Sequence, residues 1–301
     1  MIFLLAALGI LGVSASGPII AATPGVPILA MAFWRNALGS ATMAAPVLVR
    51  DPAAFGRVGR RGWGWSTVAA IALALHFICF MSAARMTTVA AATALVCLQS
   101  AWIALYQRLR GVRLPWAVAG GIALSFAGVV AITGFDLGGD PRALQGDLLA
   151  ILGGILAGAY TLAGAKARET LATGPYTTLC YGMTAVIMLG LCVALQVPLW
   201  GFGAAGWIGI LALTVFAQLM GHTIFNHLVK RLGALTVSML ILLEIPGAAL
   251  IAALLLGEAL PVGTYWGMAL IMAGLAAVVR GQRAAAPATQ AKPAELPLGA
   301  D

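Results

Sequence analysis

Long apolar segments, each about as long as a membrane-spanning helix, follow one another along almost the whole chain. A helix that crosses the roughly 30 Å hydrocarbon core of a bilayer needs about 20 mostly apolar residues. Segments of this kind lie at 2–22, 25–48, 64–83, 88–107, 114–134, 147–165, 175–196, 205–228, 235–256 and 262–279. Helix-breaking pairs such as Asp51-Pro52 and Gly174-Pro175 separate them. The pattern predicts an all-α integral membrane protein with ten transmembrane helices.

Composition supports the same class. Of 301 residues, 62% are hydrophobic and 9% are charged, and the mean hydropathy is +1.01. Soluble domains are roughly 45–50% apolar and about 25% charged, so lipid must cover much of this chain. The net charge of +8 does not indicate nucleic acid binding, because the basic residues form short clusters between apolar segments. The cysteines Cys79, Cys97, Cys180 and Cys192 lie inside apolar segments without metal or disulfide spacing. We therefore expect them to be packing residues, and we expect no metal and no cofactor.

The basic residues predict the orientation, because cytoplasmic loops are enriched in Lys and Arg. With the N-terminus inside, all but three of the 17 basic residues fall in cytoplasmic loops or the tail. The exceptions are Arg85 and Arg142 in outside loops and Arg35 within a helix. Both termini are expected in the cytoplasm, with the segment after Arg280, rich in Ala and Pro, forming a disordered tail at 281–301.

An internal repeat appears when the sequence is shifted by 146 residues. His76 then aligns with His222, and eight of the 18 positions between 111 and 128 are identical to their counterparts. The predicted units are a first repeat at 1–134, a periplasmic linker at 135–146 and a second repeat at 147–280. Each repeat has five helices, an odd number, so the second is expected to be inverted. Inverted repeats are typical of secondary transporters; the alternative is that duplication merely stabilises a bundle.

Several motifs resemble those of a known family. They are Gln218-Leu-Met-Gly-His222 with Asn226, the run Leu242–Ala249, Leu255–Glu258, Phe33-Trp34-Arg35 and Tyr181-Gly182. Together with the helix count and the repeat, they resemble the EamA-like family of the drug/metabolite transporter superfamily, over about residues 2–280. The resemblance implies a carrier of small metabolites, often an exporter of amino acids or related compounds, with its substrate between the two halves. It also implies a bacterial inner (plasma) membrane.

Two ionisable residues lie about ten residues inside predicted helices, near the bilayer centre, where a charge normally faces the protein interior or water. Glu244 is a candidate to bind a proton or a cationic group, and Arg35 a candidate to bind a carboxylate. The alternative is that they form a buried structural ion pair, or that they are polar anchors in contact with helix ends.

The predicted helix 205–228 carries Gln218, His222 and Asn226 at a spacing of four, which forms one slowly drifting stripe on an α-helix. Such a polar stripe is expected to face a cavity. His76, the repeat counterpart of His222, is expected to meet it there, and histidines can couple protons near neutral pH. The alternative is that these side chains only form hydrogen bonds between helices.

Amphipathic side chains are candidates for the remaining walls of a cavity: Gln99, Trp102, Tyr160 and Tyr181, together with Trp34. The other tryptophans at helix ends, Trp63, Trp65, Trp200 and Trp207, are expected in the interfacial belts. We expect the glycines of the fifth and tenth helices to allow close helix packing rather than ligand binding. They are Gly120, Gly121, Gly128, Gly267 and Gly274.

The sequence favours a secondary transporter that moves a small metabolite, such as an amino acid, an amine or a drug-like compound, in the direction of export. The expected partners are the substrate, the bilayer and protons as a coupling ion, with no nucleic acid, and the expected state is a monomer. A channel or a structural membrane protein is the alternative. An intramembrane enzyme is disfavoured, because no His-Glu-x-x-His or Gly-x-Ser-x-Gly motif occurs. The missing Walker motif argues against an ATP-driven pump.

Overall fold

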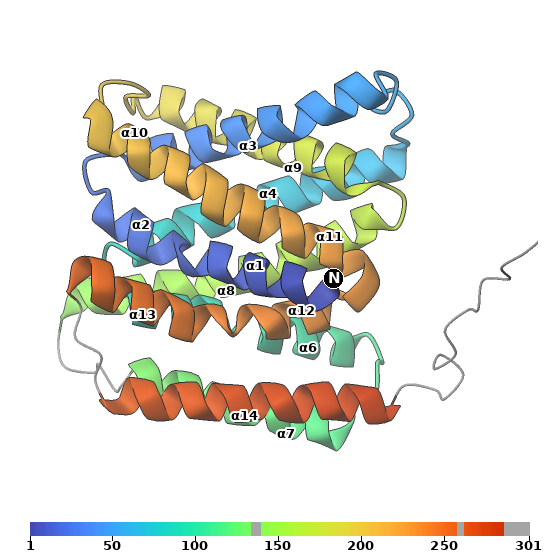
Figure 1. Ribbon diagram of the computed structural model, residues 1–301, viewed down its shortest axis with the longest axis vertical. Coiled ribbons are helices and arrows are strands. Elements are labelled where there is room, and N and C mark those ends of the chain that lie inside the picture. Colours follow the sequence, from blue (N-terminus) through green and yellow to red (C-terminus); the bar gives the residue numbers. More distant parts are fainter. Residues whose placement is uncertain (134–139, 258–261, 286–301) are drawn as a thin grey trace, which may run out of the picture.

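The computed structural model describes residues 1–133, 140–257 and 262–285, and these residues form ten membrane-length helical segments (Figure 1). Four segments consist of consecutive helices. In chain order the helices are α1 (Ile2–Ser14), α2 (Ser16–Ala22), α3 (Ile28–Arg50), α4 (Arg60–Ala83), α5 (Val89–Val96), α6 (Gln99–Leu109), α7 (Trp116–Thr133), α8 (Pro141–Arg168), α9 (Thr173–Ala194), α10 (Gly203–Ala212), the π-helix η1 (Leu213–His222), α11 (Thr223–Leu232), α12 (Ala234–Ile241), α13 (Glu244–Leu256) and α14 (Val262–Ala285).

Seven of the described segments are long and apolar enough to cross a membrane: Ile2–Ala22, Arg60–Ala83, Val89–Leu109, Pro141–Arg168, Thr173–Ala194, Gly203–Leu232 and Ala234–Leu256. Two further apolar helices, Trp116–Ala131 and Tyr265–Val278, are shorter. The remaining helix, α3, has 23 residues but carries Arg35 and Asn36 in its middle. The prediction of an all-α multi-pass membrane protein with ten helices is confirmed.

The sixth predicted segment begins earlier than its apolar residues suggest. The side chain of Asp140 accepts a hydrogen bond from the backbone N–H of Arg142 at 2.9 Å, and Pro141 occupies the first helical position. This cap starts α8 at Pro141, six residues before the apolar segment. Residues 134–139, which include the first part of the predicted linker at 135–146, lie outside the described residues. So do residues 286–301 of the predicted tail and the Glu258 of the family motif.

Helices from before residue 134 pack mainly against helices from after residue 140. The main pairs are α4 with α8, α3 with α9, α1 with η1, α5 with α13 and α7 with α14. In Figure 1 these pairs form stacked layers, with α7 and α14 together along one side. The two parts of the chain therefore interlock in a shared core, and neither forms a separate body.

The α7–α14 pair owes its close contact to glycine. A Cβ atom at Gly121 would lie 2.6 Å from the carbonyl oxygen of Gly274, and one at Gly128 would lie 2.6 Å from that of Gly267. Neither helix could approach so closely with a larger residue at these positions. The packing role is confirmed for these glycines but is wrong for Gly120, whose Cβ position has no atom within 4 Å. Gly120 is the residue next to Gly121, so its Cβ position points to a different side of the helix.

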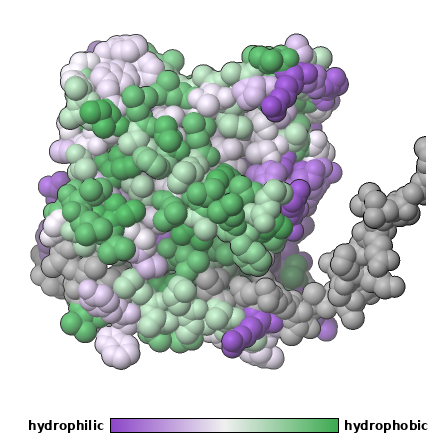
Figure 2. All heavy atoms as spheres, viewed as in Figure 1, coloured by the Kyte–Doolittle hydropathy of each residue, from purple (hydrophilic) through white to green (hydrophobic). Residues whose placement is uncertain are grey.

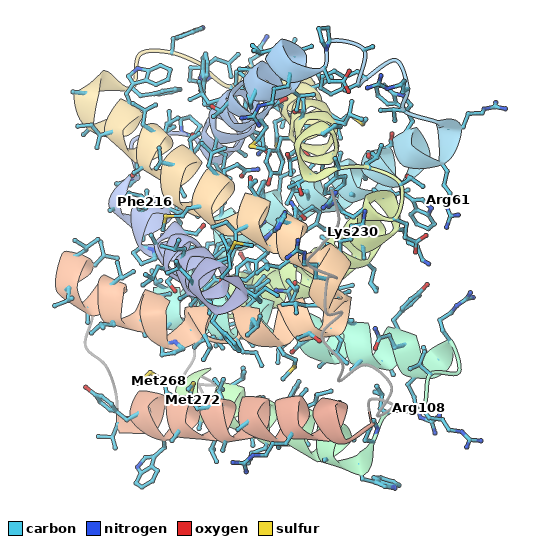
Figure 3. All side chains as sticks on the ribbon, turned by 45° about the vertical axis from the view of Figure 1, so that its right-hand side comes forward. Arg61, Arg108, Phe216, Lys230, Met268 and Met272 are labelled. Atoms are coloured by element: carbon cyan, nitrogen blue, oxygen red, sulfur yellow. The ribbon has the colours of Figure 1, made fainter. Side chains whose placement is uncertain are left out.

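Polar side chains gather at one end of the bundle. Figure 2 shows a largely apolar face with hydrophilic residues along its right-hand edge, and in Figure 3 the labelled Arg61, Arg108 and Lys230 extend from that end. The N-terminus and the end of α14 lie at the same end (Figure 1). Glu169, just after α8, is bound there by Lys166 at 2.9 Å and by Arg61 at 2.8 Å. The hydrogen bond from Lys166 and the charges of both cations lower the pKa of Glu169.

Candidate substrate cavity

The fourth and ninth helical segments are both broken near their middle. The first breaks at Cys97 and Leu98, between α5 and α6, and the second at Leu242 and Leu243, between α12 and α13. At both breaks the backbone N–H groups bond three residues back instead of four, as in Leu98 to Leu95 and Leu243 to Leu240. These tighter turns are of the 3₁₀ type. Each break leaves a polar residue, Gln99 or Glu244, as the first residue of the next helix.

The two breaks lie against each other. The Cys97 thiol donates a hydrogen bond of 3.6 Å to the carbonyl oxygen of Ile241, the last residue of α12. The break in the second segment is compatible with Pro246, because a proline in the first turn of α13 removes a backbone N–H that has no partner there in any case. Irregular backbone at membrane depth is tolerated where it is buried in protein or lines a cavity.

The eighth segment also departs from regular α-helical geometry. Residues Leu213–His222 form a π-helix, and the backbone N–H of Thr223 bonds to the carbonyl oxygen of Gln218, five residues back. A π-helix has wider turns than an α-helix and is frequent at functional sites. The expected α-helical stripe of Gln218, His222 and Asn226 is therefore not formed as predicted. The side chain of Gln218 is fully buried against α3, whereas His222 and Asn226 reach a central cavity.

The cavity lies between helices from both parts of the chain. Its polar lining comprises Ser16, His76, Gln99, Tyr160, Thr161, His222, Asn226 and Glu244. Its apolar lining comprises Val13, Phe77, Phe80, Val96, Ala157, Phe225, Val229, Val237 and Ile241. About 50 Å³ of it is open to the centres of water-sized molecules, which is room for roughly three to five waters at ~10–15 Å³ each. In this conformation the cavity is narrow, and it combines apolar walls with convergent polar groups.

His76 and His222 meet at the cavity, with ring centroids 6.4 Å apart. The Nδ1 atom of His76 is 3.0 Å from the carbonyl oxygen of Gly153, an acceptor, so this nitrogen carries the proton. The ring of His222 also contacts Phe77 and Tyr160, with centroids at 5.4 and 5.9 Å. Its nitrogens have no hydrogen-bond partner among the described residues. The His222 imidazole therefore faces the cavity with free hydrogen-bonding capacity.

Glu244 is 7% exposed and lines the cavity. Its backbone carbonyl accepts a hydrogen bond of 3.4 Å from Ser14, but its carboxyl group has no partner among the described residues. The ion pairs formed by the described residues are Arg57–Asp51, Arg61–Glu169 and Lys166–Glu169, all exposed. The alternative of a direct Arg35–Glu244 ion pair is therefore wrong for this conformation. A carboxyl group that faces a cavity without a protein partner is available to a ligand or a proton.

Arg35 is fully buried but does not line the cavity. Its Nε donates a hydrogen bond of 2.9 Å to the side-chain oxygen of Gln218, whose amide in turn donates 3.1 Å to Asn36. The guanidinium carbon lies 4.1 Å from the ring centroid of Phe77, a cation–π distance. Its two terminal nitrogens have no hydrogen-bond partner in the part of the chain that the structure describes. Because Phe77 lines the cavity, its ring separates this buried cation from the cavity space.

The tyrosines form a network around Asn226. The Asn226 amide donates to the Tyr160 hydroxyl at 2.6 Å and to the Tyr181 hydroxyl at 3.3 Å, and the latter also pairs with Thr223 at 3.1 Å. Tyr160 and Asn226 line the cavity, whereas Tyr181 lies behind them, fully buried. This network joins α8, α9 and α11 at one wall of the central cavity.

The structure thus brings six of the ten candidate residues to the cavity: His76, Gln99, Tyr160, His222, Asn226 and Glu244. Arg35, Gln218 and Tyr181 lie behind this layer. Trp102 is partly buried away from the lining, and its indole N–H has no hydrogen-bond partner among the described residues. Trp34 is also elsewhere; it bonds to the carbonyl oxygen of Leu199 at 2.7 Å within a group of aromatic rings.

Sequence reasoning missed eleven lining residues, among them the hydroxyl residues Ser16 and Thr161 and the aromatic residues Phe77, Phe80 and Phe225. Small hydroxyl residues and aromatic rings are common in membrane helices, so they gave no signal of their own. The available clue was their position, since Phe77 and Phe80 lie one and four residues after His76. Within the described ranges, no three His, Cys, Asp or Glu side chains lie close enough together to hold a metal ion.

The helix arrangement and the central polar cavity define a multi-pass helical membrane protein. Comparison with known proteins shows what the chain is similar to. Residues 144–280 match the model of the EamA-like transporter family. A solved protein crystal structure is similar along almost the full length, with a TM-score of 0.75 and 21% sequence identity, covering 94% of this chain and 98% of that one. No curated protein sequence matches.

Residues 144–280 are therefore similar in sequence to the EamA-like transporter family, and the likeness to the solved structure shows that almost the whole chain shares its fold.

Proposed function

We propose that this protein is a secondary transporter that moves a small metabolite, such as an amino acid, an amine or a drug-like compound, by alternating access in the direction of export. The observation that carries the proposal is the central cavity, which holds unpartnered Glu244 and His222 groups between helices from both parts of the chain. Transporters of this architecture bind their substrate near the bilayer midplane, where helices are discontinuous. The two breaks at Gln99 and Glu244 fit that description.

The proposed roles follow from where each group lies. Glu244 binds a substrate cation or a transported proton, because its carboxyl group faces the cavity without a partner. His222 supplies a hydrogen bond to the substrate, and His76, held by Gly153, forms the adjacent wall. Phe77 and Phe80 provide aromatic surface for an apolar or cationic group. The 3₁₀ turns at the breaks are points where the helices can bend without loss of a continuous hydrogen-bond ladder.

We further propose that the two five-helix parts are inverted repeats, a first at 1–134 and a second at 147–280. The pairing of α4 with α8 and of α3 with α9, and the break in both the fourth and the ninth segments, support this. The basic end of the bundle, which also carries the N-terminus, is assigned to the cytoplasm on the positive-inside rule. The bacterial inner membrane and a monomeric state are part of the same proposal.

Counterflow in proteoliposomes tests the proposal. Vesicles loaded with one unlabelled amino acid or amine should accumulate the labelled compound without ATP, and a panel of such compounds identifies the substrate. A channel would pass the solute without acceleration by substrate on the opposite side, and an enzyme would alter it. Either result would overturn the proposal.

Glu244→Gln provides the first residue-level prediction. The substitution keeps the shape of the side chain but removes its charge and its capacity to carry a proton, so proton-linked uptake should be lost. Glu169→Gln is the matched control, because Glu169 is an exposed carboxylate at a helix end, paired with Lys166 and Arg61. If Glu244→Gln transports with the pH dependence of the wild type, Glu244 has no part in coupling.

A further inference from the structure

A second site lies on the outer surface of the bundle, away from the central cavity. After α6 the chain makes a tight turn at Gly111, whose φ of +83° favours glycine. From there α7 runs along α14 and α5, while α6 packs on α8 and α12. The two consecutive helices therefore diverge, and an open groove with about 510 Å³ of space remains between them. This volume lies within the range of small-molecule sites.

The walls of the groove are apolar, and its mouth is basic. Ala101 and Ala104 of α6 face Ala119 and Ile122 of α7 along its length, and the small side chains leave the space open. Arg108 and Arg113 lie at the end where α6 turns into α7. Neither arginine has a hydrogen bond or an ion pair with a described residue. No acidic residue occurs between 99 and 122, so two cations stand without local compensation.

The position of the groove indicates its occupant. Its apolar part faces the zone where lipid chains surround the helices, and Trp116, 91% exposed at the start of α7, also lines it. Exposed tryptophans of this kind anchor at the headgroup level of a bilayer. The arginines extend from the basic end of the bundle, as Figure 3 shows for Arg108. Clusters of basic residues at the membrane surface attract anionic lipids.

We propose that this groove binds an anionic phospholipid, with one acyl chain between α6 and α7 and the phosphate on Arg108 and Arg113. The charge pattern favours an anionic over a zwitterionic lipid, since among the described residues the mouth carries two unpaired cations and no carboxylate. A bound acyl chain would fill the space that separates α7 from α6 and so support the α7–α14 pair against the rest of the bundle. This site is independent of the transport proposal.

Native mass spectrometry of the full-length protein in detergent, titrated with phosphatidylglycerol or phosphatidylcholine, tests the site. Each basic residue near a membrane surface contributes ~1 kcal/mol to the binding of anionic lipid. Two such residues give about a 30-fold preference for phosphatidylglycerol, at ~1.4 kcal/mol per tenfold. Arg108→Gln with Arg113→Gln should abolish this preference. Arg60→Gln with Arg110→Gln is the matched control, because it removes two exposed charges outside the groove.

A second pair of variants tests the apolar part of the groove. Ala119→Phe fills the groove without changing its charge and should reduce retention of phosphatidylglycerol at least tenfold. Ala127→Phe adds the same bulk at an exposed position of α7 outside the groove and should leave binding unchanged. Equal binding of both lipids, equal losses in the two double-arginine variants, or normal binding by Ala119→Phe would each overturn the proposal.

Discussion

The contact between α7 and α14 makes a sharp prediction for two neighbouring glycines. Ala at Gly121 places a Cβ atom 2.6 Å from the carbonyl oxygen of Gly274, 2.7 Å from Cγ2 of Val278 and 2.9 Å from its backbone nitrogen. Two of these three atoms belong to the backbone of α14, so no side-chain rotation relieves the clash. The helices must separate instead. Ala at Gly120, one residue earlier, meets no atom within 4 Å.

The magnitude follows from a comparison of the two variants. Both replace Gly by Ala inside a helix, which stabilises the helix by about 0.5–1 kcal/mol. That gain is common to both and cancels in their difference. Overpacking of a close contact costs about 1–3 kcal/mol. Gly120→Ala should therefore be more stable than the wild type, and Gly121→Ala should be less stable than Gly120→Ala by about 1–3 kcal/mol.

Gly128 extends the prediction to a double variant. Its Cβ position is 2.6 Å from the carbonyl oxygen of Gly267 and 2.8 Å from Cγ1 of Ile271, so Gly128→Ala should be destabilising as well. Once Gly121→Ala has pushed the helices apart, the second clash is partly relieved. The double variant should therefore lose less stability than the sum of the two single losses, as expected for coupled sites.

Equilibrium unfolding in mixed micelles with increasing sodium dodecyl sulfate measures these differences in free energy. A Gly121→Ala variant that is as stable as Gly120→Ala would refute the close approach of α7 and α14. Strict additivity of the Gly121 and Gly128 substitutions would refute the rigid separation of the two helices and favour independent local adjustments.

Two further predictions concern His222 in the cavity and Arg35 behind its lining. His222→Ala should raise the apparent KM for substrate in counterflow, because the imidazole faces the cavity. His227→Ala is the control, since the His227 imidazole pairs with Thr173 at 3.1 Å outside the cavity lining. Wild-type kinetics for His222→Ala would mean that this helix has only a structural role. Arg35→Met should melt at the wild-type temperature or above. The two unpartnered buried nitrogens of Arg35 carry a desolvation cost of ~1–3 kcal/mol each, which offsets its cation–π contact of about 2 kcal/mol. A large fall in melting temperature would instead make Arg35 a structural residue.

Much of the fold was predictable from the sequence, since lipid exposure imposes a simple rule on composition. Each membrane crossing needs a long apolar segment, and ten such segments match the ten helical segments found. The start of α8 was missed, because its first turn is stabilised by the Asp140 cap rather than by apolar residues. The close approach of α7 and α14 was predictable from glycines seven residues apart, but which of Gly120 and Gly121 faces the partner depends on helix rotation.

The cavity was predictable only in part, because the sequence indicates which residues face the protein interior but not how they pair there. A polar residue in an apolar helix must face the protein interior, and Arg35, Gln218, His222 and Glu244 all do. The sequence does not reveal which interior groups satisfy one another and which remain free. Gln218 is bound by Arg35, whereas His222, four residues later, is left open to the cavity. The π-helix that separates their directions has no signature in composition or spacing.

The two helix breaks have a similar backbone but present side chains of different chemistry to the cavity, Gln99 after the first break and Glu244 after the second. Under the 146-residue shift Gln99 corresponds to Ile245, yet in the structure Gln99 corresponds to Glu244, since each is the first residue after its break. The breaks touch through Cys97 and Ile241, so both polar residues begin their helices close to the same point. One part therefore offers a neutral amide to the cavity and the other a carboxyl group. A one-residue difference in where the 3₁₀ turns fall determines which side chain arrives there, and Glu244 is the single acidic group among the described lining residues.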